Sequence, residues 1–416
     1  MMTGLFQPGP VLAAMLRHKT GPLLVALQVA LSLAILCNAM LMISERLSMA
    51  ARPSGIANEQ DVFYVHVSNQ KVDGHEAQLA MQKQEEQTML AVPGVEGVAR
   101  TNSVPMSQSG WYNSLSQSGE PESATVTAAA FMSPGSLISV WKLKLTEGRD
   151  FLPEDVMEAD SKAMTSLPGV GVVTRALAKR LYPNDSSYVG KYFYNGRGSG
   201  ADRIRIVGVV DHIQSPNANA GPDDSLGFIL PIRATQDTYS GYTVRARAGQ
   251  ADRVMRDVTA ALRKASVSPL KIDMRSVSEI RADRYRNDYG MSWMLIAVCG
   301  LLFLVTATGI IGMCSLWVSQ RTRQIGIRRA LGARRVDILA YFLTENLMIT
   351  TGGIVLGVLL AMGLNQLLIR EFEMAALPAH YLLLTPLVFW LLGLVSAAAP
   401  SWRAACVAPA TATRTV

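Results

Sequence analysis

The stretch that decides the fold is SQRTRQIGIRRALGARR, residues 319–335. It follows the apolar run 290–318, which can cross a bilayer because about 20 apolar residues span a hydrocarbon core of roughly 30 Å. The stretch holds six arginines and no acidic residue. Since basic residues beside a span favour the cytoplasmic side, we expect a cytoplasmic loop at 319–337 that anchors the topology.

The pattern inside this loop leaves two interpretations open. Apolar residues alternate with the arginines, and glycines stand near possible helix ends. These features favour a short interfacial helix that docks onto a partner. Scattered arginines that only anchor the span would explain the charge equally well.

Three further apolar runs predict three more spans, at 21–43, 338–369 and 381–399. The first carries mildly polar Gln28, Ser32 and Asn38, which we expect to face other helices rather than lipid. We expect a short outer loop at 370–380 between the last two spans. The ends of the chain are expected to be cytoplasmic: an amphipathic N-terminus at 1–20 and a tail at 400–416. The sequence thus predicts an α-helical membrane protein with four transmembrane helices.

Residues 44–289 form a large polar insertion between the first and second spans. This region holds 28 basic and 28 acidic residues, so the chain's net charge of +7 comes from the membrane-flanking segments and argues against nucleic acid binding. None of the four cysteines lies in it. We expect strands at 61–67, 95–105, 124–131, 169–173, 203–210, 227–232 and 242–247, helices at 75–90, 134–142, 174–182 and 250–265, and loops at 107–121 and 214–224. The mixture predicts an α+β extracytoplasmic domain of split βαβ type.

Residues 321–334 resemble the signature R-T-R-E-I-G-I-R-R-A-L-G-A-R, which follows the second membrane helix in ABC transporter permeases of the MacB-like and FtsX-like superfamily. Gln324 is the departure, where the family usually has Glu. The resemblance extends to EGRDF at 147–151, to TRALAKRL at 174–181 before VGK at 189–191, and to IVGVV at 206–210. It implies contact with an ATPase through Arg321, Arg323, Gln324, Ile325, Gly326, Arg328, Arg329, Leu331, Gly332, Arg334 and Arg335, with Ile325 and Leu331 seated in a groove of the partner.

Three residues of the third span attract separate predictions. Glu345 lies near the beginning of the span, where we favour an ion pair with the preceding arginines over a proton relay or substrate site. Gly353 and Gly357 form a small-residue face on which another helix can approach closely.

The charged segment 276–289 runs into the second span and is either a stalk that transmits motion, as the resemblance implies, or a solvated helix that only fixes the domain above the membrane.

The sequence shows no catalytic or metal-binding motif. No G-x-x-x-x-G-K-[ST] loop occurs, and the His75-Glu76 pair lacks the second histidine of a zincin helix. We therefore expect a permease without enzymatic activity or cofactor of its own, in the inner membrane of the cell, with both termini cytoplasmic and the large domain periplasmic.

The implied mechanism is mechanotransmission, which supports export. The expected partners are a cytoplasmic ABC ATPase dimer that uses ATP and Mg²⁺, a second copy or related permease, and membrane lipids; a periplasmic adaptor is left open. The alternatives are an FtsX-like signalling permease that regulates a cell-wall hydrolase and a membrane-tethered scaffold without energy input.

Overall fold

The computed structural model describes residues 20–68, 74–218, 221–235, 239–372 and 376–406. Two compact units divide the chain: Met1–Ala50 together with Asn287–Val416, and Ala51–Arg286. The predicted amphipathic N-terminus up to residue 19 and the tail after residue 406 lie outside the described residues. We describe each unit by itself.

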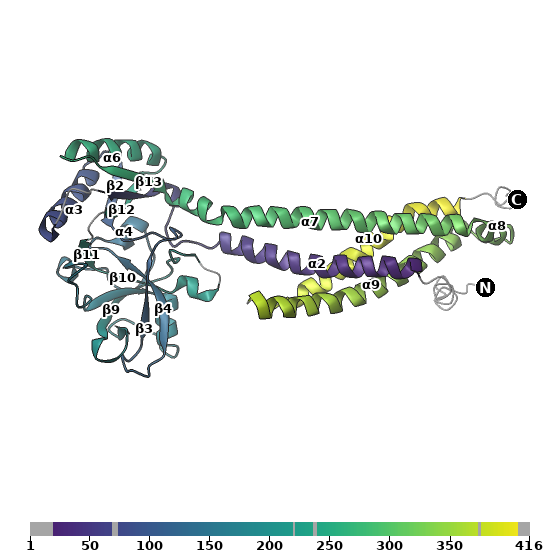
Figure 1. Ribbon diagram of the computed structural model, residues 1–416, viewed down its shortest axis with the longest axis horizontal. Coiled ribbons are helices and arrows are strands. Elements are labelled where there is room, and N and C mark those ends of the chain that lie inside the picture. Colours follow the sequence, from purple (N-terminus) through teal and green to yellow (C-terminus); the bar gives the residue numbers. More distant parts are fainter. Residues whose placement is uncertain (1–19, 69–73, 219–220, 236–238, 373–375, 407–416) are drawn as a thin grey trace. The chain divides into compact units, whose positions relative to one another are not determined.

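The first unit is a helical bundle of apolar helices (Figure 1). Four described helices are long and apolar enough to cross a membrane, and the α+β domain lies between the first and second of them in the chain. Each predicted span falls inside one of these helices, which continue beyond it. The helices are α2 (Thr20–Ala50), α7 (Val277–Gln320), α9 (Arg335–Phe372) and α10 (Ala379–Ala405).

Helix α2 forms the centre of this bundle, because its side chains Val29, Leu33 and Cys37 are fully buried. The prediction that its polar residues face other helices is confirmed for all three. Gln28 Nε2 donates to the Val305 carbonyl oxygen at 2.8 Å, and Asn38 Nδ2 donates to the Ala361 carbonyl oxygen at 3.2 Å. Thr306 Oγ1 donates to Ser32 Oγ at 2.9 Å. These bonds satisfy polar groups that would be costly in lipid.

The second unit contains a four-stranded antiparallel sheet in the order β13-β1-β12-β2. Along the chain, α3 joins β1 to β2 and α6 joins β12 to β13, so the predicted split βαβ arrangement is confirmed. Both helices pack on one face of the sheet, where Val254, Val258 and Leu262 of α6 are buried at helical spacing (Figure 1). The elements are β1 (Val62–Ser68), α3 (His75–Leu90), β2 (Val95–Arg100), β12 (Tyr239–Ala246), α6 (Ala251–Ala265) and β13 (Lys271–Ser276).

A second lobe is inserted between β2 and β12. Its sheet has the order β5-β9-β7-β10-β4-β3-β8, and pairing of β8 with β9 closes the sheet into a ring. The ring encloses an apolar core that includes Phe193, Ile206 and Phe228, and helix α5 packs on it. The strands are β3 (Trp111–Ser116), β4 (Thr125–Met132), β5 (Leu145–Gly148), β7 (Val170–Thr174), β8 (Tyr192–Asn195), β9 (Asp202–Val210) and β10 (Gly227–Leu230); the helices are α4 (Leu137–Trp141) and α5 (Arg175–Leu181).

Two sequence predictions about this lobe were wrong in detail. The segment 107–121 was expected to be a loop or an insertion point, but its centre is strand β3, whose backbone pairs with β4 over its whole length. The single strand expected at 227–232 is divided by Pro231 into β10 and β11 (Ile232–Thr235), because proline cannot donate to a ladder. Strand β11 pairs with β6 (Met157–Asp160) instead of with the main sheet.

Candidate functional site

The arginine-rich stretch folds as helix α8 (Thr322–Ala330), between α7 and α9. Its C-terminal end is closed by Gly332, whose φ of +98° is accessible to glycine at little cost. The Gly332 amide donates to the Arg329 carbonyl oxygen at 3.1 Å, and the Ala333 amide donates to the Arg328 carbonyl oxygen at 3.1 Å. This pair of bonds is a Schellman motif. The Gly332 predicted as part of the site therefore ends α8 and turns the chain towards α9.

Ile325 and Gly326 hold α8 against the bundle. Ile325 is 4% exposed and packs with Ile338, Phe342, Ala404 and Ala405. The prediction that Ile325 enters a groove of a partner was wrong, because its side chain is already covered by α9 and α10 of this chain. Gly326 is buried beside it.

Two arginines of the stretch are bonded within the chain. Arg321 Nη1 donates to both carboxylate oxygens of Glu345, at 3.0 and 2.9 Å, and Glu345 is 1% exposed. The pair predicted for Glu345 is thus present in the structure. Arg329 Nη1 donates to the Ala405 carbonyl oxygen at 2.8 Å, at the end of α10. These two residues position α8, and their predicted contact with an ATPase stays a prediction.

Several other residues of the stretch are exposed, and Leu331 is the most exposed apolar residue among them, at 83%. Ile327, four residues earlier in the sequence, is 47% exposed. Arg328 lies with its guanidinium 5.0 Å from the centre of the Tyr341 ring while remaining exposed. We call this set the α8 surface; it consists of Arg323, Gln324, Ile327, Arg328, Leu331, Arg334 and Arg335.

The predicted glycine face of α9 lies against α2. A Cβ atom at Gly353 would come within 2.7 Å of the Ala26 carbonyl oxygen, and one at Gly357 within 3.0 Å of Ala30. Backbones this close need glycine on one side. By contrast, a Cβ at Gly352 would meet nothing within 4 Å.

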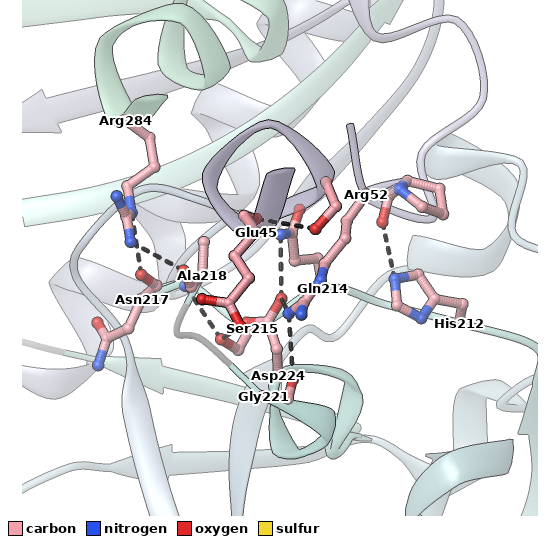
Figure 2. A network of polar contacts seen from close by, with 12 residues as sticks. Glu45, Arg52, His212, Gln214, Ser215, Asn217, Ala218, Gly221, Asp224 and Arg284 are labelled. Carbon is pink, nitrogen blue, oxygen red and sulfur yellow. Dashed lines mark hydrogen bonds and ion pairs between the residues drawn. The ribbon is translucent and has the colours of Figure 1, made fainter. Parts of the chain in front are cut away.

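A second polar arrangement, which the sequence did not reveal, lies at the beginning of α7. This part of α7 belongs to the second unit, Ala51–Arg286, which we call the soluble unit. Arg281 grips the Glu59 carboxylate through Nε and Nη2 at 2.7 and 2.6 Å, and its Nη1 donates to the Arg52 carbonyl oxygen at 2.9 Å. Arg284 donates to the carbonyl oxygens of Asn217 and Ala218 at 3.1 and 2.8 Å (Figure 2). The beginning of α7 is thereby fixed to the chain that enters the domain and to the loop after β9. The sequence signal that could have revealed this arrangement is the spacing of Arg281 and Arg284, because residues three or four apart share one helix face.

The loop after β9 is itself organised around Asp224. Its carboxylate accepts from Ser215 Oγ at 2.6 Å and from Gln214 Nε2 at 3.0 Å, and Arg52 lies 3.8 Å away (Figure 2). Gln214 also donates to the Tyr285 hydroxyl of α7 at 2.7 Å. Residues predicted only as a loop therefore form an ordered polar layer against the beginning of α7.

A buried charge cluster joins the two lobes of the soluble unit. Glu85 of α3 accepts from the Tyr242 hydroxyl at 2.6 Å, and Arg233 of β11 pairs with Glu86 at 2.7 Å. Burial raises the pKa of Glu85 to about 7, while the Tyr242 hydrogen bond and nearby Arg100 oppose that shift. Among the residues that the structure describes, no group of three or more metal-binding side chains occurs.

Comparison with known families decides the relationship of the chain. The MacB-like periplasmic core domain matches residues 24–261, and the FtsX-like permease C-terminal domain matches residues 296–409. The chain belongs to the MacB-like and FtsX-like permease family. In this chain, α8 and the exposed arginines lie within the FtsX-like match. Both lobes of the soluble unit lie in the MacB-like match, except that the last residues of α6 and strand β13 follow its end.

Two curated relatives are similar to about half of this chain. The macrolide export ATP-binding/permease protein MacB of Acinetobacter baylyi is 25% identical over 221 residues, which cover 52% of this chain and 32% of that protein. The pyoverdine export ATP-binding/permease protein PvdT of Pseudomonas putida is 28% identical over 243 residues, covering 56% of this chain and 35% of that protein. The chain thus spans about a third of the length of these relatives.

Among solved structures, the extracellular domain of the noncanonic ABC-type transporter YknZ from Gram-positive bacteria aligns with a TM-score of 0.31 and 12% identity. The alignment covers 50% of this chain and 99% of that one.

Proposed function

We propose that this chain is the permease subunit of an ABC transporter, which receives force from a cytoplasmic ATPase dimer and changes the shape of its periplasmic domain to export a substrate. In this proposal α8 is a coupling helix on the cytoplasmic side of the inner membrane. The ATPase binds ATP and Mg²⁺, and the permease acts as a dimer with a second copy or a related permease.

The observation that carries the proposal is the α8 surface. A short helix whose inner face is fixed by Ile325, Arg321 and Arg329 presents Leu331 and free-standing positive charge on its outer face. An exposed leucine in a stretch with exposed arginines suits a partner surface with an apolar groove and acidic rim. The internal bonds matter equally, because a helix fixed to α9 and α10 moves those helices when it is pushed.

The connection to the outer domain supports the direction of force transfer. Helix α7 continues without a break from Val277 to Gln320, so its two ends belong to one element. At its beginning, Arg281 and Arg284 are bonded to separate segments of the soluble unit. A displacement of α7 therefore acts on the domain through defined bonds.

The experiment is charge reversal on the α8 surface, read out as stimulation of the partner ATPase in nanodiscs. We expect Arg323→Glu combined with Leu331→Asp to reduce stimulation at least tenfold, because like charge and a buried carboxylate each cost about 1–3 kcal/mol at an interface. Arg370→Glu, which repeats the Arg323→Glu charge change on an exposed residue at the other end of α9, serves as the control. Unchanged stimulation in the double variant would refute the coupling role.

A further inference from the structure

A cavity of about 400 Å³ lies in the soluble unit on the side of the four-stranded sheet opposite α3 and α6. Alternation along β1 sends Phe63 and Val65 into the core beneath the helices and turns Tyr64 and His66 to the other face. In the register of β1 with β13, Tyr64 is paired with Arg275 and His66 with Asp273. These four side chains form the floor of the cavity, whose volume is in the range of small-molecule sites.

The wall of the cavity is a loop, residues 102–109, that the fold holds in a demanding conformation. Met106 and Gln108 have φ values of +64° and +58°, in the left-handed region that side chains disfavour. Their amides donate to the carbonyl oxygens of Ser215 and Pro216 at 3.2 and 2.9 Å. Backbone strain that is held in place by surrounding bonds is typical of functional sites.

Ser103 gives the second and independent observation. It lines the cavity and is 2% exposed, and its Oγ has no hydrogen-bond partner within the described part of the chain. A buried hydroxyl without a partner is costly, and such groups in a native structure call for an explanation. The Oγ itself is covered while the cavity is empty, so a turn of the Ser103 side chain would offer it to a ligand there, which would then supply the partner.

The charges around the cavity are of both signs. Arg275 Nη1 lies 3.4 Å from Asp283 Oδ2 and its Nε lies 3.9 Å from Asp273 Oδ2, so one cation stands between two carboxylates. Asp283 also pairs with Arg286. All of these side chains are more than a third exposed and can exchange partners with a ligand. Burial lowers the pKa of His66 below its ordinary value; Asp273 opposes this shift and Lys271 adds to it. The imidazole is therefore uncharged near pH 7.

We propose that this cavity binds a small zwitterion of the size of an α-amino acid, with its ammonium group at Asp273 and Asp283, its carboxylate at Arg275, and a polar side group at Ser103. An anion without an amine would face two uncompensated carboxylates, and a cation without an acid would face Arg275. A molecule carrying both groups replaces each internal ion pair with one of its own. Since Ile280 and Asp283 of α7 complete the lining, occupancy bears directly on the beginning of the stalk.

The proposal does not require the ATPase-coupling role, so the two can fail separately. Its test uses the full chain in nanodiscs and isothermal titration with three matched probes: glutamine, glutaminamide, which lacks the carboxylate, and N-acetylglutamine, which lacks the amine. We expect glutamine to bind in the millimolar range or tighter, and each of the other two to bind at least about tenfold more weakly, as the loss of one charged contact implies. Equal binding of the three probes, or no binding of glutamine, would overturn the proposal.

Two variants locate the binding. Ser103→Ala is expected to weaken glutamine binding several-fold without creating a buried polar group, and Arg275→Gln is expected to remove the preference for glutamine over glutaminamide. Arg263→Gln, on an exposed position of α6, serves as the control and leaves affinity unchanged. If the control lowers affinity as much as the cavity variants do, the site lies elsewhere. The ranking of probes on the unmodified chain remains decisive should a variant fold poorly.

Discussion

Glu85 makes the stability of the soluble unit depend on pH in a direction opposite to that of most carboxylates. Its pKa rises from 4.5 to about 7 in the folded chain, chiefly through burial. The folded state therefore keeps a proton that the unfolded state has already lost between these values, and stability falls as pH increases through this window. At about 1.4 kcal/mol per pH unit, the shift corresponds to about 3 kcal/mol lost by pH 8.

The perturbation that isolates this effect is Glu85→Gln. The carbonyl oxygen of a glutamine side chain accepts the hydrogen bond from the Tyr242 hydroxyl in the same way, yet glutamine never ionises. We expect the variant to match the unmodified chain near pH 4.5 and to exceed it by up to about 3 kcal/mol at pH 8. For a unit of this size, that difference raises the melting temperature by roughly 6–12 °C.

The assay is thermal unfolding of the full chain in nanodiscs between pH 4.5 and 8, with Glu76→Gln as the control on an exposed position of the same helix. The quantity of interest is the difference between variant and unmodified chain, because other titrating groups cancel in it. A difference that stays constant with pH, or that decreases towards pH 8, would refute the reasoning.

Two further predictions concern packing and the stalk. Gly353→Val is expected to destabilise the bundle by about 1–3 kcal/mol through its collision with α2, whereas Gly352→Val next to it is tolerated; equal melting temperatures would contradict the close approach. Arg281→Gln removes the two-bond grip on Glu59 and is expected to lower the unfolding free energy of the soluble unit by about 1–3 kcal/mol, measured by urea titration, and an equal loss in the exposed α6 variant Arg256→Gln would show that the grip is not responsible.

The sequence predicted best those features that periodicity and composition control. The four spans stand out because each is a long run of apolar residues. The α3 boundaries at His75 and Leu90 were predicted to the residue, because a polar helical run ends shortly before Pro93-Gly94. The split βαβ type also followed from the alternation of strands and helices, although strand β13 was not among the expected strands. All of these depend on near neighbours in the chain.

The features that the sequence missed depend on residues far apart in it. Strand β3 mixes Trp111 and Leu115 with polar residues at no clear period, and its pairing with β4 and β8 makes it a strand. The division of α8 into a buried and an exposed face was likewise invisible, because Ile325 meets Phe342 and Ala404 only after α9 and α10 have folded back. Arg281 reaches Glu59 across more than two hundred residues, and no local pattern marks such a partner.

The most direct test of the coupling account places a photo-crosslinking amino acid at Leu331, the most exposed apolar residue of the α8 surface, in cells that produce the native partners. Leu301 of α7, which is 61% exposed within the apolar part of that helix, is the control position. The account predicts that position 331 crosslinks to an ABC ATPase and that position 301 does not. Crosslinking of position 331 to lipid alone, or to a protein on the outer side of the membrane, would contradict it.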